Sequence, residues 1–190
     1  MRQASDLPRI VVTGSESTGK TTLAREIAAA LDTIWLPEFS RIYAEAGNQP
    51  LSAATVEPIA RGHMAAEDAA APFATGVLVL DADLVSTTVY SEHYYGFCTP
   101  WIMAAARERL GSLYLLAAID LPWEADGVCD QPEARAIVHQ RFVDRLHELG
   151  AHVAPVRGVG SERLTHALKA IAVWRRSPVG VRNGPEGGGQ

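Results

Sequence analysis

Short runs of aliphatic and β-branched residues recur along the chain and alternate with longer stretches that have helical periodicity. Most of the runs stop at a glycine, a proline or an aspartate, which is typical of strands buried on both faces of a parallel sheet. The clearest run, Val77–Leu80, ends on Asp81. We therefore predict strands at residues 10–12, 33–36, 77–80, 113–119 and 152–156.

Apolar residues recur three or four positions apart in the intervening stretches, which predicts amphipathic helices. Gly150 follows one of these stretches at the position expected for a helix C-terminus, and Ser161 is a candidate N-cap for the last stretch. The predicted helices cover residues 22–31, 53–74 (as one long helix or two short ones), 133–149 and 161–173. Strands that alternate with helices predict an α/β fold: a five-stranded parallel sheet with helices on both faces and ligands at the carboxyl ends of the strands.

Length, composition and charge narrow the class of protein. A chain of 190 residues, 47% hydrophobic and 21% charged, fits one compact domain. Its net charge of −5 at pH 7 argues against nonspecific binding to nucleic acid or to an anionic membrane. The sequence shows neither an apolar run long enough for a membrane span nor a secretory leader, so we expect a cytoplasmic protein. We expect a single domain over residues 1–173 and a disordered tail over residues 174–190, which have little to bury.

The segment Gly14–Thr21 has the spacing G-x-x-x-x-G-K-[ST] and lies between the first predicted strand and the first predicted helix. Its two glycines permit a tight turn whose backbone N–H groups point at phosphate oxygens, and the helix N-terminus adds its positive end. In such a P-loop, Lys20 reaches the β- and γ-phosphates and the Thr21 hydroxyl is a ligand for Mg²⁺. The pattern predicts a site for a nucleoside triphosphate, formed by Gly14, Ser15, Glu16, Ser17, Thr18, Gly19, Lys20, Thr21 and Thr22.

An aspartate at the end of a hydrophobic strand is the second feature expected of such a site. Asp81 has this position, where a carboxylate holds Mg²⁺ directly or through water. One alternative gives this role to Asp83 and leaves Asp81 for the substrate, and another makes Asp81 only the cap of the next helix. We predict Thr21 and Asp81 as metal ligands and Asp83 as a catalytic residue.

Glu38 follows Pro37 at the end of the second predicted strand, so we expect it to face the ligand cleft. A carboxylate there can accept the proton of an attacking hydroxyl or hold ribose hydroxyls. Arg41 would lie one helical turn away and could bind phosphate oxygens. The alternative is a surface ion pair between these two residues. We predict Glu38, Arg41 and Lys20 as catalytic residues.

The acidic segment Asp120–Gly127 follows the fourth predicted strand and is too rich in proline and glycine for a helix interior. It could be a mobile lid, with Arg135 and Arg141 covering phosphates, or an ordinary acidic loop. Trp101 and Trp123 are candidates for stacking on a base, although a lone tryptophan is more often a core residue. The histidines and the two cysteines lack the spacing of a zinc site.

Taken together, these residues resemble the ribosylnicotinamide kinase domain of NadR-type proteins, within a wider group of P-loop ATPases. The similar segments are VVTGSESTGKTTLA (11–24), PEFSR (37–41), IARGH (59–63), DADLVSTTVYSE (81–92), LYLL with DLPWEADG (113–127) and the ERL near Glu162. The resemblance implies ATP with Mg²⁺ and phosphorylation of the 5′-hydroxyl of nicotinamide riboside. It places ATP on residues 14–22, the metal at Thr21 and the Asp81/Asp83 pair, and acceptor chemistry near Glu38 and Arg41. The P-loop begins at residue 14 and the sequence shows no second nucleotide motif, so we expect no adenylyltransferase domain.

The chain departs from the family pattern at three positions. The family places two aromatic rings around the nicotinamide, and the corresponding residues are Pro37 and, roughly, Ala69. Cys129 stands where the family lid often has an arginine, so either Arg135 substitutes or the kinase is weak. Two alternatives therefore accompany the kinase hypothesis: a kinase for another nucleoside-like alcohol, and a P-loop ATPase that acts as a regulatory or binding module.

Overall fold

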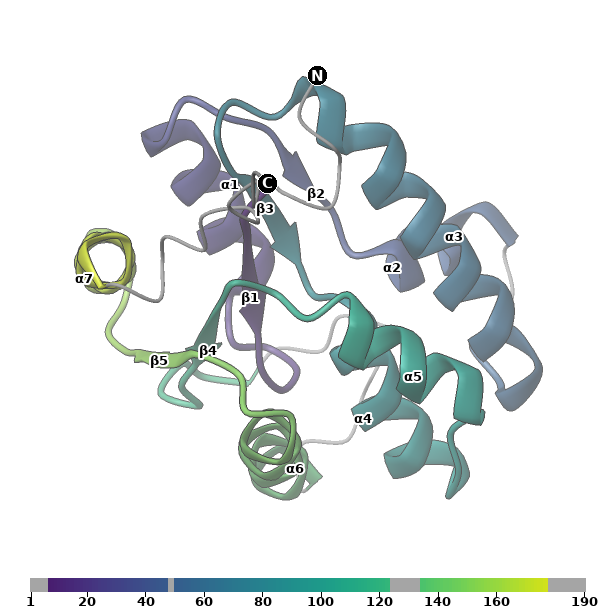
Figure 1. The fold of residues 1–190 in the computed structure, drawn as a ribbon. Coiled ribbons are helices and arrows are strands. Elements are labelled where there is room, and N and C mark those ends of the chain that lie inside the picture. Colours follow the sequence, from purple (N-terminus) through teal and green to yellow (C-terminus); the bar gives the residue numbers. More distant parts are fainter. Residues whose placement is uncertain (1–6, 48–49, 124–133, 178–190) are drawn as a thin grey trace, which may run out of the picture.

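The computed structural model describes residues 7–47, 50–123 and 134–177, and its center is a five-stranded parallel sheet. The strand order is β2-β3-β1-β4-β5. The strands are β1 (Arg9–Thr13), β2 (Trp35–Leu36), β3 (Leu78–Asp81), β4 (Leu113–Ala117) and β5 (Val153–Val156). The chain leaves β1, forms β2 at the edge and returns to place β3 between them (Figure 1). The predicted α/β fold with five parallel strands is confirmed.

Helices cover both faces of this sheet, as predicted (Figure 1). Helices α1 and α7 pack on one face, and α3, α4, α5 and α6 pack on the other, with α2 beside α3. The helices are α1 (Lys20–Ala30), α2 (Phe39–Gly47), α3 (Val56–Ala70), α4 (Leu84–Tyr95), α5 (Pro100–Glu108), α6 (Arg135–Glu148) and α7 (Ser161–Arg176), with the short 3₁₀ turns η2 (Ala53–Thr55) and η3 (Ala71–Phe73) flanking α3.

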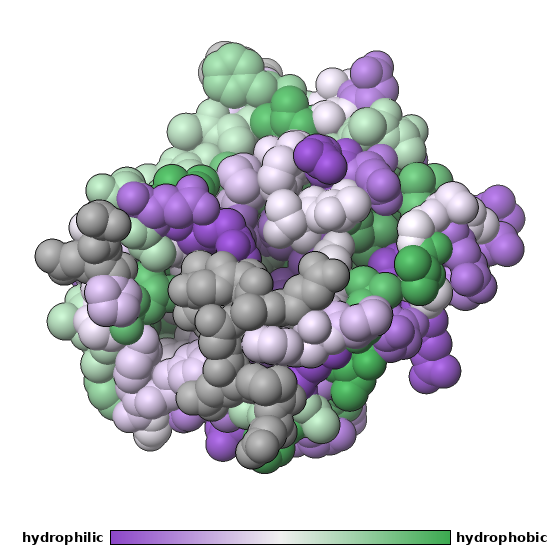
Figure 2. Space-filling model, turned by 180° about the vertical axis from the view of Figure 1, so that it is seen from behind, coloured by the Kyte–Doolittle hydropathy of each residue, from purple (hydrophilic) through white to green (hydrophobic). Residues whose placement is uncertain are grey.

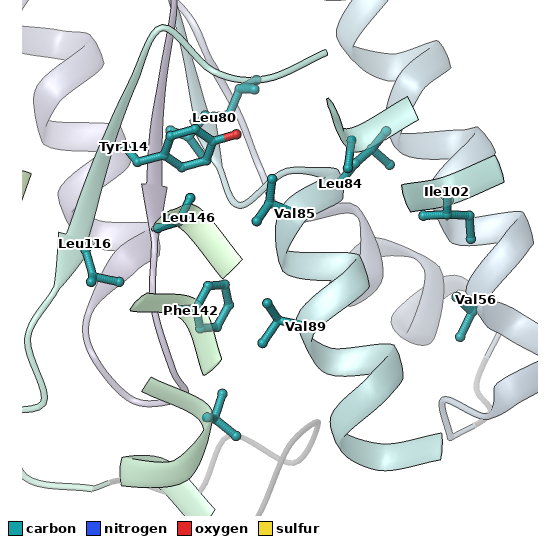
Figure 3. Close-up of a cluster of buried hydrophobic side chains, with 14 of the residues drawn as sticks. Val56, Leu80, Leu84, Val85, Val89, Ile102, Tyr114, Leu116, Phe142 and Leu146 are labelled. Atoms are coloured by element: carbon teal, nitrogen blue, oxygen red, sulfur yellow. The ribbon is translucent and has the colours of Figure 1, made fainter. Parts of the chain in front are cut away.

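Successive residues of the central strands point to opposite faces and so build two separate cores. In β1, Val11 joins the core under α3 to α6, whereas Ile10 and Val12 join the core under α1 and α7. Figure 3 shows the first core, where Phe142 and Leu146 of α6 face Val85 and Val89 of α4. This burial on both faces explains why the strands read as continuous hydrophobic runs.

Several element boundaries differ from the predicted ones. Helix α1 begins at Lys20, two residues early, because Gly19 (φ 71°) already occupies the N-cap position. Gly160 (φ 54°) likewise precedes α7, so the prediction of Ser161 as N-cap was wrong and Ser161 is the first helical residue. Helix α7 continues to Arg176, three residues past the predicted end of the domain, because Trp174 packs against the core. The rest of the predicted tail, residues 178–190, lies outside the described residues.

Three helices, α2, α4 and α5, are not among the predicted helices. Residues on several sides of α4 are buried, including Val85, Ser86, Thr88 and Val89, so its sequence lacks a polar face. A helix enclosed by its neighbours loses the periodic signal that marks an amphipathic helix. Its contacts with α3, α5 and α6 could therefore not be inferred from local spacing.

On the face opposite to the view of Figure 1, the described hydrophobic residues are interspersed with hydrophilic ones (Figure 2). Within the described ranges, no helix has both the length and the apolar character needed to cross a membrane.

Phe142 offers a test of this packing, since it is fully buried and its ring meets the Tyr90 ring edge-on at 5.5 Å. We expect Phe142→Ala to lower the free energy of unfolding by about 3–5 kcal/mol, because it leaves a cavity between α4 and α6. Its neighbour Val143 is 37% exposed. Val143→Ala should cost less than about 1 kcal/mol. Urea denaturation of both variants measures the difference, and equal losses would contradict the assigned core.

Candidate active site

The predicted P-loop connects β1 to α1 through a turn with three left-handed residues. Gly14, Ser17 and Gly19 have φ values of 132°, 51° and 71°. A Cβ on Gly14 would lie 3.0 Å from the Ala117 carbonyl oxygen, so only glycine fits where the loop passes β4. A serine in the left-handed region is strained, and such strain is typical of ligand-binding loops.

The lysine of the loop folds back over the turn. The Lys20 ammonium donates a hydrogen bond of 2.8 Å to the Ser15 carbonyl, which also accepts one of 2.8 Å from the Thr18 hydroxyl. Lys20 therefore lies within the loop, at the start of α1, as the motif predicts. Such an arrangement of lysine, backbone amides and a helix N-terminus can bind phosphate groups.

Asp81 lies opposite the P-loop because β1 and β3 are adjacent, with Val12 paired to Asp81. The Thr21 hydroxyl donates a hydrogen bond of 2.5 Å to Asp81 Oδ2, while the buried Oδ1 accepts none from the described residues. Burial raises the pKa of Asp81 to about 6, and the nearby Glu38 carboxylate adds to this rise. A desolvated carboxylate with an unused oxygen beside a hydroxyl fits the predicted Mg²⁺ ligands.

Asp83 has a different environment from Asp81, and Ala82 between them adopts a left-handed φ of 64°. Asp83 Oδ1 accepts hydrogen bonds from the backbone N–H groups of Val85 and Ser86 at the start of α4. Its Oδ2 accepts one of 2.5 Å from the Tyr114 hydroxyl. Burial raises the pKa of Asp83 to about 6. The helix-capping interpretation considered for Asp81 thus applies to Asp83, and these contacts weigh against its predicted catalytic role.

A cavity of about 720 Å³ opens beside the P-loop between α2, α3 and α4. Glu38 and Arg41 both line it, rather than forming a pair on the outer surface. The Glu38 carboxylate accepts a hydrogen bond of 2.8 Å from the Ser40 hydroxyl. Both side chains act electrostatically on Asp81, Glu38 raising its pKa and Arg41 lowering it. The cavity is therefore adjacent to the predicted metal ligands.

Aromatic rings line this cavity at positions that the sequence analysis did not identify. They are Phe39 from α2 and Tyr90, Tyr94 and Tyr95 from α4. Tyr90 and Tyr94 stack at 6.1 Å between centroids. Tyr90 and Tyr94 could have been identified by their i, i+4 spacing in the segment that follows the two aspartates. Pro37 and Ala69, the residues aligned with the family's rings, are not among the described lining residues.

Two of these tyrosines also contact the P-loop. The Tyr90 hydroxyl donates to the Gly14 carbonyl at 3.3 Å, and the Tyr94 hydroxyl donates to Glu16 Oε1 at 2.8 Å. The cavity and the P-loop thus share a wall. This adjacency is what a group transfer between two bound ligands requires.

His63 is a further lining residue that the sequence analysis missed, although it ends the IARGH segment. Its Nε2 lies 3.9 Å from Glu67, which also pairs with Arg9 at 2.6 Å. Burial lowers the pKa of His63, with Arg109 contributing to the decrease and Glu67 opposing it. His63 is therefore neutral near pH 7 and forms part of the cavity wall in that state.

Residues 124–127 of the predicted lid lie outside the described residues, as does Cys129. Arg135 is described, and it donates hydrogen bonds to the Ser17 carbonyl at 2.9 Å and to the Leu121 carbonyl at 2.8 Å. It thus contacts the backbone of the P-loop, and its predicted role in covering phosphates stays a prediction.

The two tryptophans do not stack into the site. Trp101 lies under the Arg61 guanidinium, 4.4 Å from the ring centroid, and neither Trp101 nor Trp123 is among the described residues that line the cavity. The prediction that either stacks on a base gains no support from this placement.

Comparisons with known sequences identify related proteins. The sequence model of a family described as an AAA domain matches residues 9–163. The "Trifunctional NAD biosynthesis/regulator protein NadR" of Escherichia coli (strain K12) and that of Salmonella typhimurium (strain LT2) are each 29% identical to the chain over 123 residues. The match covers 63% of the chain, which spans 30% of the length of these relatives.

Solved structures show the same fold. A crystal structure of NadR protein in complex with NR matches with a TM-score of 0.77 and 24% identity over 90% of this chain and 51% of that one. A crystal structure of NadR protein in complex with NAD and AMP-PNP matches with a TM-score of 0.74 and 23% identity, over 96% of this chain and 52% of that one. A crystal structure of thymidylate kinase from Ehrlichia chaffeensis matches with a TM-score of 0.60 and 14% identity, over 87% of this chain and 97% of that one. The fold is therefore that of P-loop kinases, and the resemblance to NadR-type proteins is confirmed.

The raised pKa of Asp81 predicts a pH-dependent stability. The folded protein keeps a proton on Asp81 up to about pH 6, whereas the unfolded chain releases it near pH 4. The free energy of unfolding therefore falls as pH rises through this window. We expect Asp81→Asn to remove that loss and stabilise the ligand-free protein by about 2–3 kcal/mol at pH 7, with a much smaller effect at pH 4.

Urea denaturation at both pH values measures this effect, with Asp144→Asn, a change at an exposed aspartate of α6, as the matched control. The pKa of Asp83 is also raised to about 6, so part of the pH dependence of the unfolding free energy remains in both variants. An Asp81→Asn protein that is less stable than the parent at pH 7 would contradict the assigned desolvation.

Proposed function

This chain belongs to the AAA domain family, and we propose that it is an ATP-dependent kinase that phosphorylates the 5′-hydroxyl of nicotinamide riboside. The observation that carries the proposal is the cavity lined by Glu38 and Arg41 that shares a wall with the P-loop through Tyr90 and Tyr94. A cradle for phosphate alone would serve an ATPase equally well. The adjacent cavity adds a place for a second substrate.

On the nucleotide side, residues 14–22 would hold the triphosphate. We expect Lys20 to exchange its bond to the Ser15 carbonyl for phosphate oxygens. Thr21 and Asp81 would hold Mg²⁺, which neutralises phosphate charge when it is bound. The described residues contain no cluster of three or more His, Cys, Asp or Glu side chains that could hold a metal ion, which agrees with a metal that takes its other ligands from nucleotide and water.

On the acceptor side, the Glu38 carboxylate would accept the proton of the acceptor hydroxyl while the oxygen of that hydroxyl forms a bond to the γ-phosphorus. The bond between that phosphorus and the leaving oxygen of ADP breaks in the same transfer, and Glu38 later releases the proton to water. Arg41, with its guanidinium in the same cavity, would stabilise charge on the transferred phosphoryl group.

Three properties of the cavity support a nucleoside as acceptor. Its volume of about 720 Å³ is in the range of small-ligand sites. Its lining combines aromatic rings with the carboxylates of Glu38 and Glu45, which suits a ring that carries positive charge. The related NadR structure was solved with NR bound. Another nucleoside-like alcohol is the alternative, since Pro37 and Ala69 stand at the family's ring positions and the rings of this cavity come from Phe39 and α4.

The direct test measures ADP production from MgATP with and without nicotinamide riboside. We expect strong stimulation by the acceptor and a phosphorylated product of the corresponding mass. Glu38→Gln should lower kcat by about 100-fold or more while leaving ATP binding unchanged, because only proton transfer is removed. Lys20→Ala, which disrupts the phosphate cradle, should abolish turnover and serves as the inactive control.

The outcomes separate the alternatives. Faster turnover with a different nucleoside would identify another acceptor of the same kinase. Equal ADP production with every nucleoside and without one would instead indicate a regulatory ATPase. An unchanged kcat in Glu38→Gln would remove Glu38 from the role of base.

Gly62 tests the acceptor cavity separately from the nucleotide site. A Cβ on Gly62 would lie 2.2 Å from the Phe39 ring, so the ring occupies its place in the cavity wall only because α3 has glycine there. We expect Gly62→Ala to displace the ring and raise the KM for the acceptor about fivefold, equivalent to roughly 1 kcal/mol of binding, without changing the KM for ATP.

Gly47→Ala is the matched control, because an added Cβ there meets no atom within 4 Å. Steady-state kinetics with each substrate varied in turn measure both KM values. A parallel rise in the KM for ATP would show that the substitution disturbs more than the Phe39 wall.

A further inference from the structure

Arg163 in the first turn of α7 reaches the P-loop from outside the predicted motif. The residue is only 3% exposed. Its guanidinium donates hydrogen bonds to the Thr18 carbonyl of the P-loop, to the Gly158 carbonyl at 2.7 Å and to the Asp120 carboxylate. A buried guanidinium must have its N–H groups satisfied, and here one partner is the backbone of the phosphate cradle.

Asp120 keeps this guanidinium in place. One carboxylate oxygen accepts from Arg163, and the other accepts a 2.8 Å hydrogen bond from the Gly158 backbone N–H. Asp120 follows β4 and Gly158 follows β5, so the pair ties the ends of two strands to the P-loop. A planar guanidinium bound on several sides can hold only one orientation.

The bond to the Thr18 carbonyl determines where the next N–H points. In a trans peptide unit, the C=O and N–H bonds are coplanar and point in opposite directions. Because Arg163 holds the Thr18 oxygen, the Gly19 N–H in the same peptide unit points in the opposite direction, away from Arg163. Arg135 likewise donates a hydrogen bond to the Ser17 carbonyl, and this bond orients the Thr18 N–H of the same peptide unit.

These peptide units need an external constraint. Ser17 and Gly19 both have left-handed φ values, and rotation of the intervening peptides would turn their N–H groups away from the phosphates. Donors that already point at the position of the negative charge avoid a cost of reorganisation when the ligand binds.

We propose that Arg163, oriented by Asp120, is a positioning residue that holds the peptide between Thr18 and Gly19 with its N–H directed at the triphosphate. This inference rests on the nucleotide-binding part of the proposed function and not on the identity of the acceptor. Arg163 does not itself contact the nucleotide in this role.

The test compares Asp120→Ala, Arg163→Lys and Arg163→Gln by titration with inorganic tripolyphosphate and with MgATP. We expect all three variants to bind tripolyphosphate more weakly, by at least tenfold in Arg163→Gln and at least threefold in the other two. Binding of nicotinamide riboside should change by less than twofold. Arg175→Gln, at an exposed arginine of the same helix, is the matched control and should bind like the parent.

Asp120→Ala and Arg163→Lys separate positioning from simple charge attraction. If only charge mattered, removal of the Asp120 carboxylate would strengthen tripolyphosphate binding, and lysine at position 163 would leave it unchanged. Either result overturns the proposal. The Asp120 side chain is 35% exposed. Asp120→Ala therefore still decides the question if the substitutions of the buried Arg163 prevent folding.

The readout also separates this inference from the proposed kinase activity. A parent protein that binds tripolyphosphate but does not phosphorylate nicotinamide riboside removes the acceptor assignment and leaves the role of Arg163 intact. If the parent protein is an active kinase and folded Arg163→Gln binds tripolyphosphate as tightly as the parent does, only the role of Arg163 is refuted.

Discussion

The adjacency of β1 and β3 is the constraint on which the candidate site depends. The two strands are far apart in the sequence, yet their pairing places Asp81 beside Val12, two residues before the P-loop begins. The hydrogen bond between Thr21 and Asp81 is the direct consequence. The same crossover brings α2 and α4 to the carboxyl edge of the sheet, so the acceptor cavity opens at the place where the phosphate cradle ends.

The site concentrates negative charge in a poorly solvated region. Burial raises the pKa values of Asp81 and Asp83, and Glu38 and Glu67 add to the respective increases. Asp83 is compensated by backbone amides and by Tyr114, whereas one oxygen of Asp81 has no hydrogen-bond partner among the described residues. This difference separates a structural carboxylate from one that suits a cation. It also makes the ligand-free protein less stable than a neutral site would be.

Cations act on the P-loop from outside as well as from within. Lys20 lies inside the loop, while Arg135 and Arg163 hold carbonyl groups from the protein side. The carbonyl groups are thereby satisfied away from the nucleotide, and the N–H groups of the same peptides are available to it. The loop's geometry thus depends on residues near the ends of β4 and β5 as much as on its own glycines.

The sequence by itself determined the parallel α/β fold, the P-loop at residues 14–21 and the position of Asp81, because each is encoded by neighbouring residues with a fixed spacing. It also indicated Glu38 and Arg41, since both follow directly from the end of a strand. Only the tertiary structure decided that Asp83 caps α4, that the rings of Phe39, Tyr90 and Tyr94 line the cavity, and that Arg163 reaches Thr18. Arg163 and Thr18 are 145 positions apart. Such contacts arise from the packing of whole helices against the sheet, for which the local pattern of residues carries no signal.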